Sequence, residues 1–356
     1  MDIGIRAAGF KVLAEVEVDQ HCCSTLRNAV LKNKTETVVI NSDIRKLNPT
    51  TLGEEYSLNL KKLDLLFGGP PCQSFSLAGK QLGLKDERGP LLFEIIRFAE
   101  ALRPKVVLLE QVKGLLSAKG PNNRRGEVFD LFLSELARIG YIPKWRVILA
   151  ADYGVPQLRE RLFVVATYGK NGFEFPERTH APSEECDGLF SYKKYKTAGE
   201  ALAGLGEPLK KRIGTTNYDD VESNHVDVTP ERDRERIAQV PEGSYLASQT
   251  HLGQDLLRGL SAKDTTKYLR LHRNRPSNTL RCGEIFYHPT KDRYLTPREY
   301  MRIHGYPDEY SLKGPIRSRT GTVKSLDLHR QIANSVPPPV ARILGESIMN
   351  YLKGYK

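Results

Sequence analysis

The stretch Leu63–Ser76, which reads LDLLFGGPPCQSFS, decides the fold. It begins with a short, mostly apolar run and passes at Gly68-Gly69-Pro70-Pro71 into a turn. A strand stops there because proline lacks the N–H that a sheet ladder needs. A thiol, Cys72, follows directly. A buried apolar run that ends in a turn bearing a reactive group is typical of a central strand whose carboxyl end carries a functional site.

Strand-like and helix-like segments alternate on both sides of this stretch, over the first 170 residues. Apolar, strand-like runs lie at Val12–Val18, Val38–Ile40, Val106–Leu109, Trp145–Ala150 and Leu162–Ala166. Helical spacing of apolar residues occurs at Leu91–Leu102 and Glu127–Ile139, and again late in the chain at Val336–Tyr351. This alternation predicts an α/β domain with a mostly parallel sheet that helices cover on both faces.

The periodicity weakens after about residue 170. Residues 170–270 are rich in Gly, Pro, Tyr, Lys and Asp, which predicts a second, smaller and less regular domain. A length of 356 residues suits two domains. Hydrophobic residues make up 39% and charged residues 27%, so the chain can form a core and a disordered protein is excluded.

The charge balance favours an anionic partner. The chain has 54 Lys and Arg against 43 Asp and Glu, a net charge of +11. Basic side chains gather at Arg258–Arg281 and Lys313–Arg330, and each run has two interpretations, a solvated surface or a nucleic-acid contact. No apolar run approaches the roughly 18 residues of a membrane span, and no signal peptide is visible. We therefore expect no membrane partner.

The cysteines indicate a reducing compartment. There are five of them, an odd and sparse set that does not suit a disulfide framework. His21-Cys22-Cys23 lacks the spacing of metal ligands, so we expect no metal. The sequence predicts a cytoplasmic protein.

Polar groups follow several of the predicted strands. Glu17-Val18-Asp19, Asp43 and Glu110 stand at strand ends, as Cys72 does. Each carboxylate alone is most simply a helix N-cap or a loop residue. In an open parallel sheet, however, the carboxyl ends of the strands meet at one edge, where a carboxylate commonly binds ribose hydroxyls. Together they indicate a site with a nucleophile and nucleotide-binding carboxylates.

Five ordered motifs carry a family resemblance. They are Gly69–Ser76, Glu110-Gln111-Val112, Gln157-Leu158-Arg159-Glu160-Arg161, Arg275-Pro276-Ser277-Asn278-Thr279 and Gln331–Pro338. In this order they resemble the motifs of the C5-cytosine-specific DNA methyltransferases of restriction-modification systems. The resemblance spans nearly the whole chain.

The resemblance implies a fold and a domain organisation. The fold would be the Rossmann-like mixed sheet of S-adenosylmethionine-dependent methyltransferases, with a smaller, irregular target-recognition domain. Residues 1–171 would form the catalytic and cofactor-binding domain and residues 172–285 the target-recognition domain. Residues 286–356 would return to the first domain, with the C-terminal helix packing back on it.

The resemblance also implies an activity, methyl transfer to C5 of a flipped cytosine in a specific duplex DNA sequence, which protects host DNA. Cys72 would be the nucleophile that adds to C6. Glu110 would act at N3 of the ring, Arg159 would orient the cytosine O2, and Arg161 would support the loop electrostatically.

The implied cofactor is S-adenosyl-L-methionine. Glu17 would bind the ribose hydroxyls and Asp43 the adenine amino group, with Val18 and Ile44 beside the adenine. Pro71, Leu91, Asn334 and Val336 would complete the pocket, although Leu91 and Val336 also suit an ordinary apolar core.

The chain departs from the family pattern at three places. The family begins with a strand and a Phe-x-Gly-x-Gly-Gly turn before a helix that ends in Ala-Gly-Phe, and Met1–Phe10 resembles that helix alone. We therefore expect roughly a dozen further residues ahead of Met1, with a start site placed too late or a truncation as the cause. Gln111 replaces the usual Asn, which predicts tuning of the site. Ala333 replaces the usual Gly, which predicts either a backbone without positive φ or a backbone that tolerates mild strain.

The expected partner is double-stranded DNA, bound by a monomer. A cognate restriction endonuclease would act on the same site without a stable complex. Three alternatives remain: an RNA cytosine methyltransferase, an inactive DNA-binding or regulatory homologue, and a nicotinamide-dependent oxidoreductase. The Cys-Phe-Thr tripeptide of the transfer-RNA enzymes of this fold is absent from the sequence, and an oxidoreductase would give Cys72 and the arginine motif no role.

Overall fold

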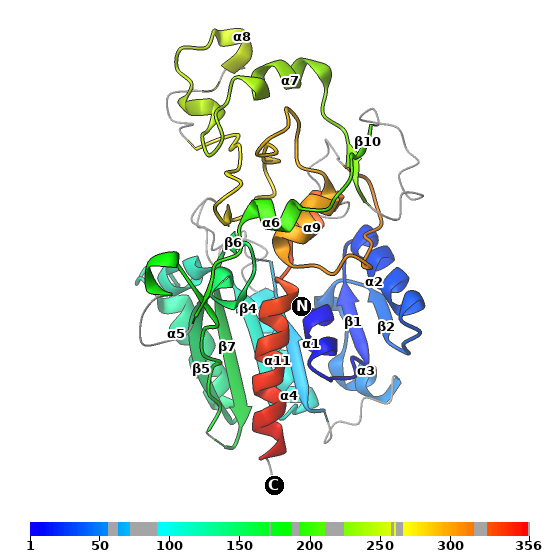
Figure 1. Ribbon diagram of the computed structural model, residues 1–356. Helices are drawn as coiled ribbons and strands as arrows, with labels where there is room; N and C mark the ends of the chain where they lie inside the picture. Colours follow the sequence, from blue (N-terminus) through cyan, green and yellow to red (C-terminus); the bar gives the residue numbers. More distant parts are fainter. Residues whose placement is uncertain are drawn as a thin grey trace.

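The computed structural model describes residues 1–55, 63–71, 91–170, 172–186, 192–210, 224–257, 260, 266–316 and 326–354. It has two lobes, a lower one that holds the longer strands and an upper one with little regular structure (Figure 1). The longer strands are β1 (Ala14–Glu17), β2 (Val38–Asn41), β3 (Leu65–Gly68), β4 (Val106–Gln111), β5 (Tyr141–Leu149) and β7 (Glu160–Tyr168). The helices of the lower lobe are α1 (Asp2–Ala7), α2 (Gln20–Lys32), α3 (Pro49–Glu55), α4 (Leu91–Leu102), α5 (Glu127–Arg138) and α11 (Pro338–Lys353).

The upper lobe and the connections contain shorter elements. The helices are α6 (Ala198–Leu202), α7 (Glu231–Ala238), α8 (Gln254–Leu257), α9 (Pro297–His304) and α10 (Leu328–Asn334). The two-residue strands are β6 (Gln157–Leu158), β8 (His180–Ala181), β9 (Lys193–Lys194), β10 (Leu209–Lys210), β11 (Val226–Asp227) and β12 (Ser277–Asn278).

The larger sheet is mixed, in the order β3-β4-β7-β5. Strands β3 and β4 are parallel, whereas β7 runs antiparallel to both β4 and β5. The direction of β7 follows from its short connection to β5, which has no crossover helix between the two strands. The mixed sheet implied by the family resemblance is therefore confirmed, and the mostly parallel sheet predicted from the apolar pattern is wrong for this sheet.

Helices cover both faces of this sheet, as predicted. Side chains of β4 alternate between the faces, because successive residues of a strand point in opposite directions. Val106 and Leu108 pack with Leu344 and Ile348 of α11, while Val107 and Leu109 pack with residues of α4 and α5. All six residues of β4 are buried, which makes it the central strand of the lobe.

Helix α11 lies close against α1. A Cβ at Gly4 would stand 2.4 Å from the Pro338 carbonyl oxygen, and one at Gly345 would stand 2.7 Å from the Ala8 Cβ. Small residues therefore let the two backbones approach. Helix α11 begins at Pro338, two residues later than predicted, because its first turn accepts proline without losing a helical hydrogen bond.

Strands β1 and β2 form a separate parallel pair. The Val38 N–H donates to Leu13 O, so Ala14 and Val16 direct their backbone groups away from β2. On β3, the Val106 N–H donates to Asp64 O, so Leu65 and Phe67 direct theirs away from β4. Both of these edges line one cleft. Among the described residues, β1 and β3 thus each turn an edge without a strand partner toward the cleft, and we call the space between these two edges the open interval.

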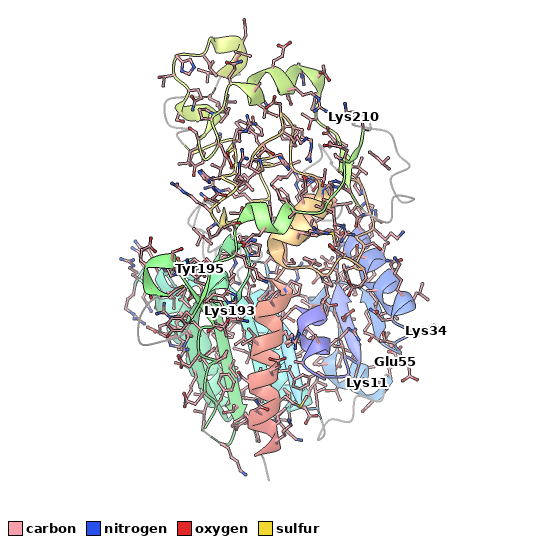
Figure 2. All side chains as sticks on the ribbon, in the orientation of Figure 1. Lys11, Lys34, Glu55, Lys193, Tyr195 and Lys210 are labelled. Carbon is pink, nitrogen blue, oxygen red and sulfur yellow. The ribbon has the colours of Figure 1, made fainter. Side chains whose placement is uncertain are left out.

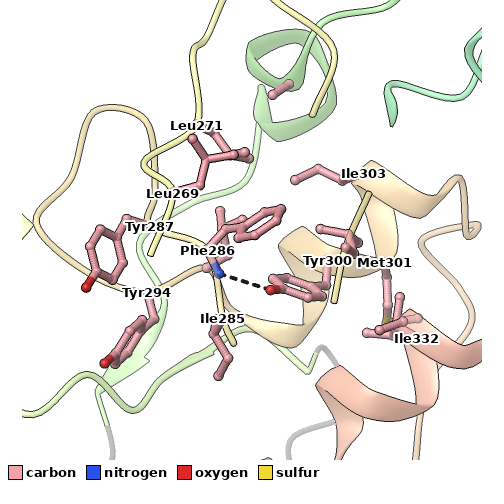
Figure 3. Packing of buried hydrophobic residues seen from close by; sticks show 14 of the residues in the cluster. Leu269, Leu271, Ile285, Phe286, Tyr287, Tyr294, Tyr300, Met301, Ile303 and Ile332 are labelled. Carbon is pink, nitrogen blue, oxygen red and sulfur yellow. Dashed lines mark hydrogen bonds between the residues drawn. The ribbon is translucent and has the colours of Figure 1, made fainter. Parts of the chain in front are cut away.

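A separate core holds the upper lobe together (Figure 3). It is built from buried residues between Ala198 and Ala333, and the Tyr300 hydroxyl accepts a hydrogen bond from the Phe286 N–H at 3.0 Å inside it. Helices α9 and α10 thus pack with the irregular segment before them, whereas α11 packs with the sheets.

The first part of the segment after residue 171 stays with the lower lobe. Phe173 and Phe175 are buried in the same cluster as α11. Tyr195, labelled in Figure 2, donates its hydroxyl hydrogen bond to Asp152, which follows β5. This segment therefore crosses the sheet-bearing lobe before the chain enters the upper one.

Candidate active site

A cleft of 2570 Å³ runs between the two lobes. Its walls include the edges of β1 and β3, the ends of β4 and β7, and the segment 279–284 of the upper lobe. The predicted site residues that line it are Glu17, Val18, Asp43, Ile44, Pro71, Leu91, Glu110, Arg159, Arg161 and Asn334. The structure therefore brings together residues that lie as far apart in the sequence as Glu17 and Asn334. Cys72 lies outside the described residues, directly after Pro71 in the sequence.

Glu110 and Arg161 form an ion pair at the end of the central strand. The Arg161 Nε lies 3.1 Å from a Glu110 carboxylate oxygen. Burial raises the pKa of Glu110 above its usual value, and the two arginines Arg161 and Arg159 oppose this shift. The net direction is upward, so this carboxyl is protonated more readily than an exposed glutamate, and its protonated form can donate a hydrogen bond.

Arg159 is almost fully buried, at 2% exposure. It stands between β6 and β7, and its Nη2 donates to the carbonyl oxygens of Ala333 at 2.8 Å and Ser335 at 3.2 Å. Ala333 lies in helix α10 and is not among the residues with positive φ, which is the first of the two alternatives predicted from its replacement of glycine. The C-terminal motif therefore fixes the arginine motif.

Gln111 anchors the turn that leads to Cys72. Its Nε2 donates to the Pro70 carbonyl oxygen at 3.3 Å, and its Oε1 accepts from the Val112 N–H at 2.8 Å. A Cβ at Gly69 would lie 3.2 Å from a Glu110 carboxylate oxygen, so glycine lets the turn pass close to that carboxyl. The longer amide at 111 reaches the turn directly.

The carboxylate of Glu17 closes the end of β1. Its Oε1 accepts from the Val18 and Asp19 N–H groups at 2.7 and 2.8 Å, and burial raises its pKa. Asp19 caps α2, and it also accepts from the Leu326 N–H of the C-terminal segment at 2.8 Å. Val18 lines the cleft beside them with 40% of its surface exposed.

Asp43 caps a short helix and also lines the cleft. It caps the short helix Ile44–Lys46, and both of its oxygens accept from Arg45. A hydrogen bond from Arg45 lowers the pKa of Asp43 to about 2. A ligand at this carboxylate would share it with that arginine.

The remaining predicted residues divide between cleft and core. Asn334 accepts from the Cys282 thiol at 2.8 Å, a contact between α10 and the segment 279–284 that the sequence did not indicate. Leu91 and Pro71 lie in the cleft wall. Val336 is 4% exposed and lies in the apolar cluster with α11, which is the core interpretation of that residue.

Two of the motifs pair through short strands. Ser277 and Asn278 of β12 run parallel to Gln157 and Leu158 of β6. The Thr279 hydroxyl donates to Leu158 O at 2.7 Å. The motif after the irregular segment thus docks on the arginine motif.

No helix in the described part of the chain is long and apolar enough to cross a membrane. The described residues also contain no group of three or more His, Cys, Asp or Glu side chains suited to a metal ion.

Comparisons with known proteins agree with the site. The family model of the C-5 cytosine-specific DNA methylases matches residues 1–350. The type II methyltransferase M.Eco47II of Escherichia coli is 33% identical over 99% of this chain and 76% of its own length. M.NgoMIV of Neisseria gonorrhoeae is 31% identical over 99% of this chain and 94% of its own.

Solved structures share the fold. A prophage-encoded protein of E. coli, described as a DNA modification methyltransferase, has a TM-score of 0.70 at 22% identity, over 99% of this chain and 95% of its own. The Dnmt2 methyltransferase of S. pombe has a TM-score of 0.55 at 14% identity, over 99% of this chain and 95% of its own. The chain therefore belongs to the family of C-5 cytosine-specific DNA methylases.

Proposed function

We propose that Cys72, Glu110, Arg159 and Arg161 carry out the chemistry of a DNA cytosine-5 methyltransferase, the activity that the family match and the type II relatives support. The observation that carries the assignment of roles is the buried carboxyl of Glu110 beside two arginines at the end of the central strand. Cys72 is included because it directly follows Pro71, a residue of the cleft wall, in the sequence.

The reaction begins with the Cys72 thiolate, which forms a bond to C6 of the cytosine. The electron pair of the C5–C6 double bond moves into the ring, where a proton from Glu110 at N3 relieves the developing charge. Arg159 donates to the cytosine O2, and Arg161 holds the Glu110 carboxyl in place. C5 then forms a bond to the methyl group, whose bond to the donor sulfur would break with the electron pair left on that sulfur. Loss of the C5 proton to a base restores the double bond and releases the thiolate, and N3 returns its proton to Glu110.

We propose S-adenosyl-L-methionine as the methyl donor, which supplies an electrophilic methyl group when bound. The side chains of the cleft suit this molecule. The carboxylates of Glu17 and Asp43 can accept hydrogen bonds from hydroxyl and amino groups, and Val18 offers an exposed apolar surface beside Glu17. Ile44, Pro71, Leu91 and Asn334 would form the remaining walls. Val336 would support these walls from the apolar core behind them.

The proposed substrate is duplex DNA with its target cytosine flipped into the cleft, because C5 is inaccessible in a stacked duplex. Residues 1–171 would form the catalytic domain, 172–285 the target-recognition domain and 286–356 the return segment. We propose a cytoplasmic monomer that protects host DNA, with a cognate endonuclease that acts on the same sequence. The type II names of the relatives support this role.

Bisulfite sequencing of DNA from cells that express the protein tests this function. We expect protected cytosines at one recurring sequence, and none with Cys72→Ser. Full activity of Cys72→Ser would exclude Cys72 as the nucleophile. Methylation of transfer RNA, with duplex DNA untouched, would instead identify an RNA enzyme.

A further inference from the structure

His304 is a buried titratable residue to which the reaction above gives no role. It is the last residue of α9 and has 0% exposure. Its Nε2 lies 3.0 Å from the Ser335 carbonyl oxygen, and its Nδ1 lies 3.0 Å from the Gln157 Nε2. These two partners belong to the C-terminal motif and the arginine motif, so His304 links the two motifs that surround Arg159.

The partners fix the tautomer of the ring. A carbonyl oxygen only accepts, so the Nε2 must carry the hydrogen and donate it to Ser335 O. The Gln157 side-chain nitrogen only donates, so the Nδ1 must be the acceptor. The remaining amide oxygen of Gln157 accepts from the Leu280 N–H at 3.1 Å. The chain of hydrogen bonds therefore has one consistent direction, from Gln157 through His304 to Ser335.

Arg159 and His304 donate to the same acceptor at the end of this series of hydrogen bonds. The Arg159 Nη2 donates to the same Ser335 carbonyl oxygen, at 3.2 Å, and to Ala333 O. That carbonyl oxygen is thus held between the imidazole N–H and the guanidinium. Gln157 stands two residues before Arg159, so His304 contacts a side chain of the arginine motif and the carbonyl oxygen to which Arg159 donates.

We propose that His304 is a positioning residue that, as the neutral Nε2–H tautomer, aims the Arg159 guanidinium at the flipped cytosine. The proposal rests on the proposed role of Arg159 in the reaction. It assigns a role to a side chain that lies behind the cleft and touches the substrate only through Arg159.

The surroundings of His304 keep the ring neutral. Burial is the main cause that holds its pKa well below the usual value, and the positive charges of Arg159 and Arg161 act in the same direction. Tyr306 stacks near the ring, with centroids 6.0 Å apart and an angle of 30° between the planes. A charged ring would lose the hydrogen bond from Gln157, since both nitrogens would then donate.

Two amide variants separate positioning from packing. His304→Gln keeps a donor at the reach of Nε2, whereas His304→Asn keeps an acceptor near Nδ1 and loses the reach to Ser335 O. We expect His304→Asn to lower kcat by about tenfold or more, with KM for duplex DNA nearly unchanged. His304→Gln should stay within about threefold of wild type. A role in packing alone would affect both variants alike, and thermal melting verifies that both fold.

Arg159→Lys serves as the reference variant. If it lowers kcat while His304→Asn does not, the positioning role is wrong and the proposed function stands. If it keeps the wild-type kcat, the role of Arg159 itself is wrong. Nitrogen-15 NMR of the histidine ring is independent of turnover: we expect the proton on Nε2 between pH 6 and 8, and a proton on Nδ1 would overturn the proposal.

Discussion

At the scale of single residues, the site depends on a carboxyl that is more easily protonated than usual. Burial raises the pKa of Glu110, and the protonated form is the one that can donate to N3 of cytosine. The protonated fraction of an acid falls as pH rises through its pKa. We therefore expect the single-turnover methylation rate of the wild type to fall with rising pH through the raised pKa of Glu110.

Replacement of this carboxyl tests the assignment. Glu110→Gln retains a donor of the same shape but transfers no proton, so we expect a loss of about 100-fold or more in the methylation rate with DNA affinity retained. Glu135→Gln, at a side chain of α5 that is 41% exposed and lies outside the cleft lining, is the matched control and should leave the rate unchanged. A Glu110→Gln rate equal to wild type would show that donation of a hydrogen bond is sufficient.

At the scale of elements, the packing of α1 on α11 depends on glycine. A Cβ at Gly4 would meet backbone atoms of Pro338 and Arg342, which cannot move away as a flexible side chain can. We expect Gly4→Ala to lower the free energy of unfolding by about 1–3 kcal/mol, as an overpacked core does. Gly206→Ala is the control, because nothing lies within 4 Å of its added Cβ. Equal melting temperatures for the two variants would contradict the tight contact.

The open interval between β1 and β3 gives a second prediction at this scale. Its two edges carry backbone groups that a parallel strand would pair, and β1 stays only partly buried without one. We expect an added segment ahead of Met1, about a dozen residues with an apolar strand and a Gly-rich turn, to raise both the melting temperature and the affinity for S-adenosylmethionine. The same segment with prolines in the strand should do neither, since it cannot form a ladder.

The sequence predicts elements where local forces determine them. The helix Leu91–Leu102 has the predicted bounds, because its apolar stripe and the following proline act within a few residues. The direction of β7 depends on its connection to β5 and on its neighbours, which no local pattern encodes. The residues of the cleft were predicted from sequence motifs, and the fold brings these motifs together. The sequence marked Gln111 only as a departure from the family pattern and did not indicate His304 at all, because the contacts of both residues are hydrogen bonds between distant segments.

At the scale of the whole molecule, the two lobes have separate cores, and one buried group in each lobe links stability to pH in the opposite direction. In the upper lobe, burial lowers the pKa of His288 to about 4. The unfolded chain then binds a proton more readily than the folded one, so the stability of this lobe falls as pH decreases from about 6.5. In the sheet lobe, burial raises the pKa of Glu15 to about 7. Its folded state binds the proton more readily, so this lobe loses stability as pH rises toward 7.

Calorimetry at pH 5 and pH 7.5 tests this opposition. We expect acidification to lower the melting temperature of the upper-lobe transition and to raise that of the sheet-lobe transition. His288→Asn keeps an acceptor for the Thr290 and Lys291 N–H groups but does not titrate, so it should remove the acid sensitivity of the upper lobe. Glu15→Gln should do the same for the sheet lobe. Because the catalytic cleft lies between the lobes, a single transition that moves in one direction would mean that the cleft joins them into one cooperative unit.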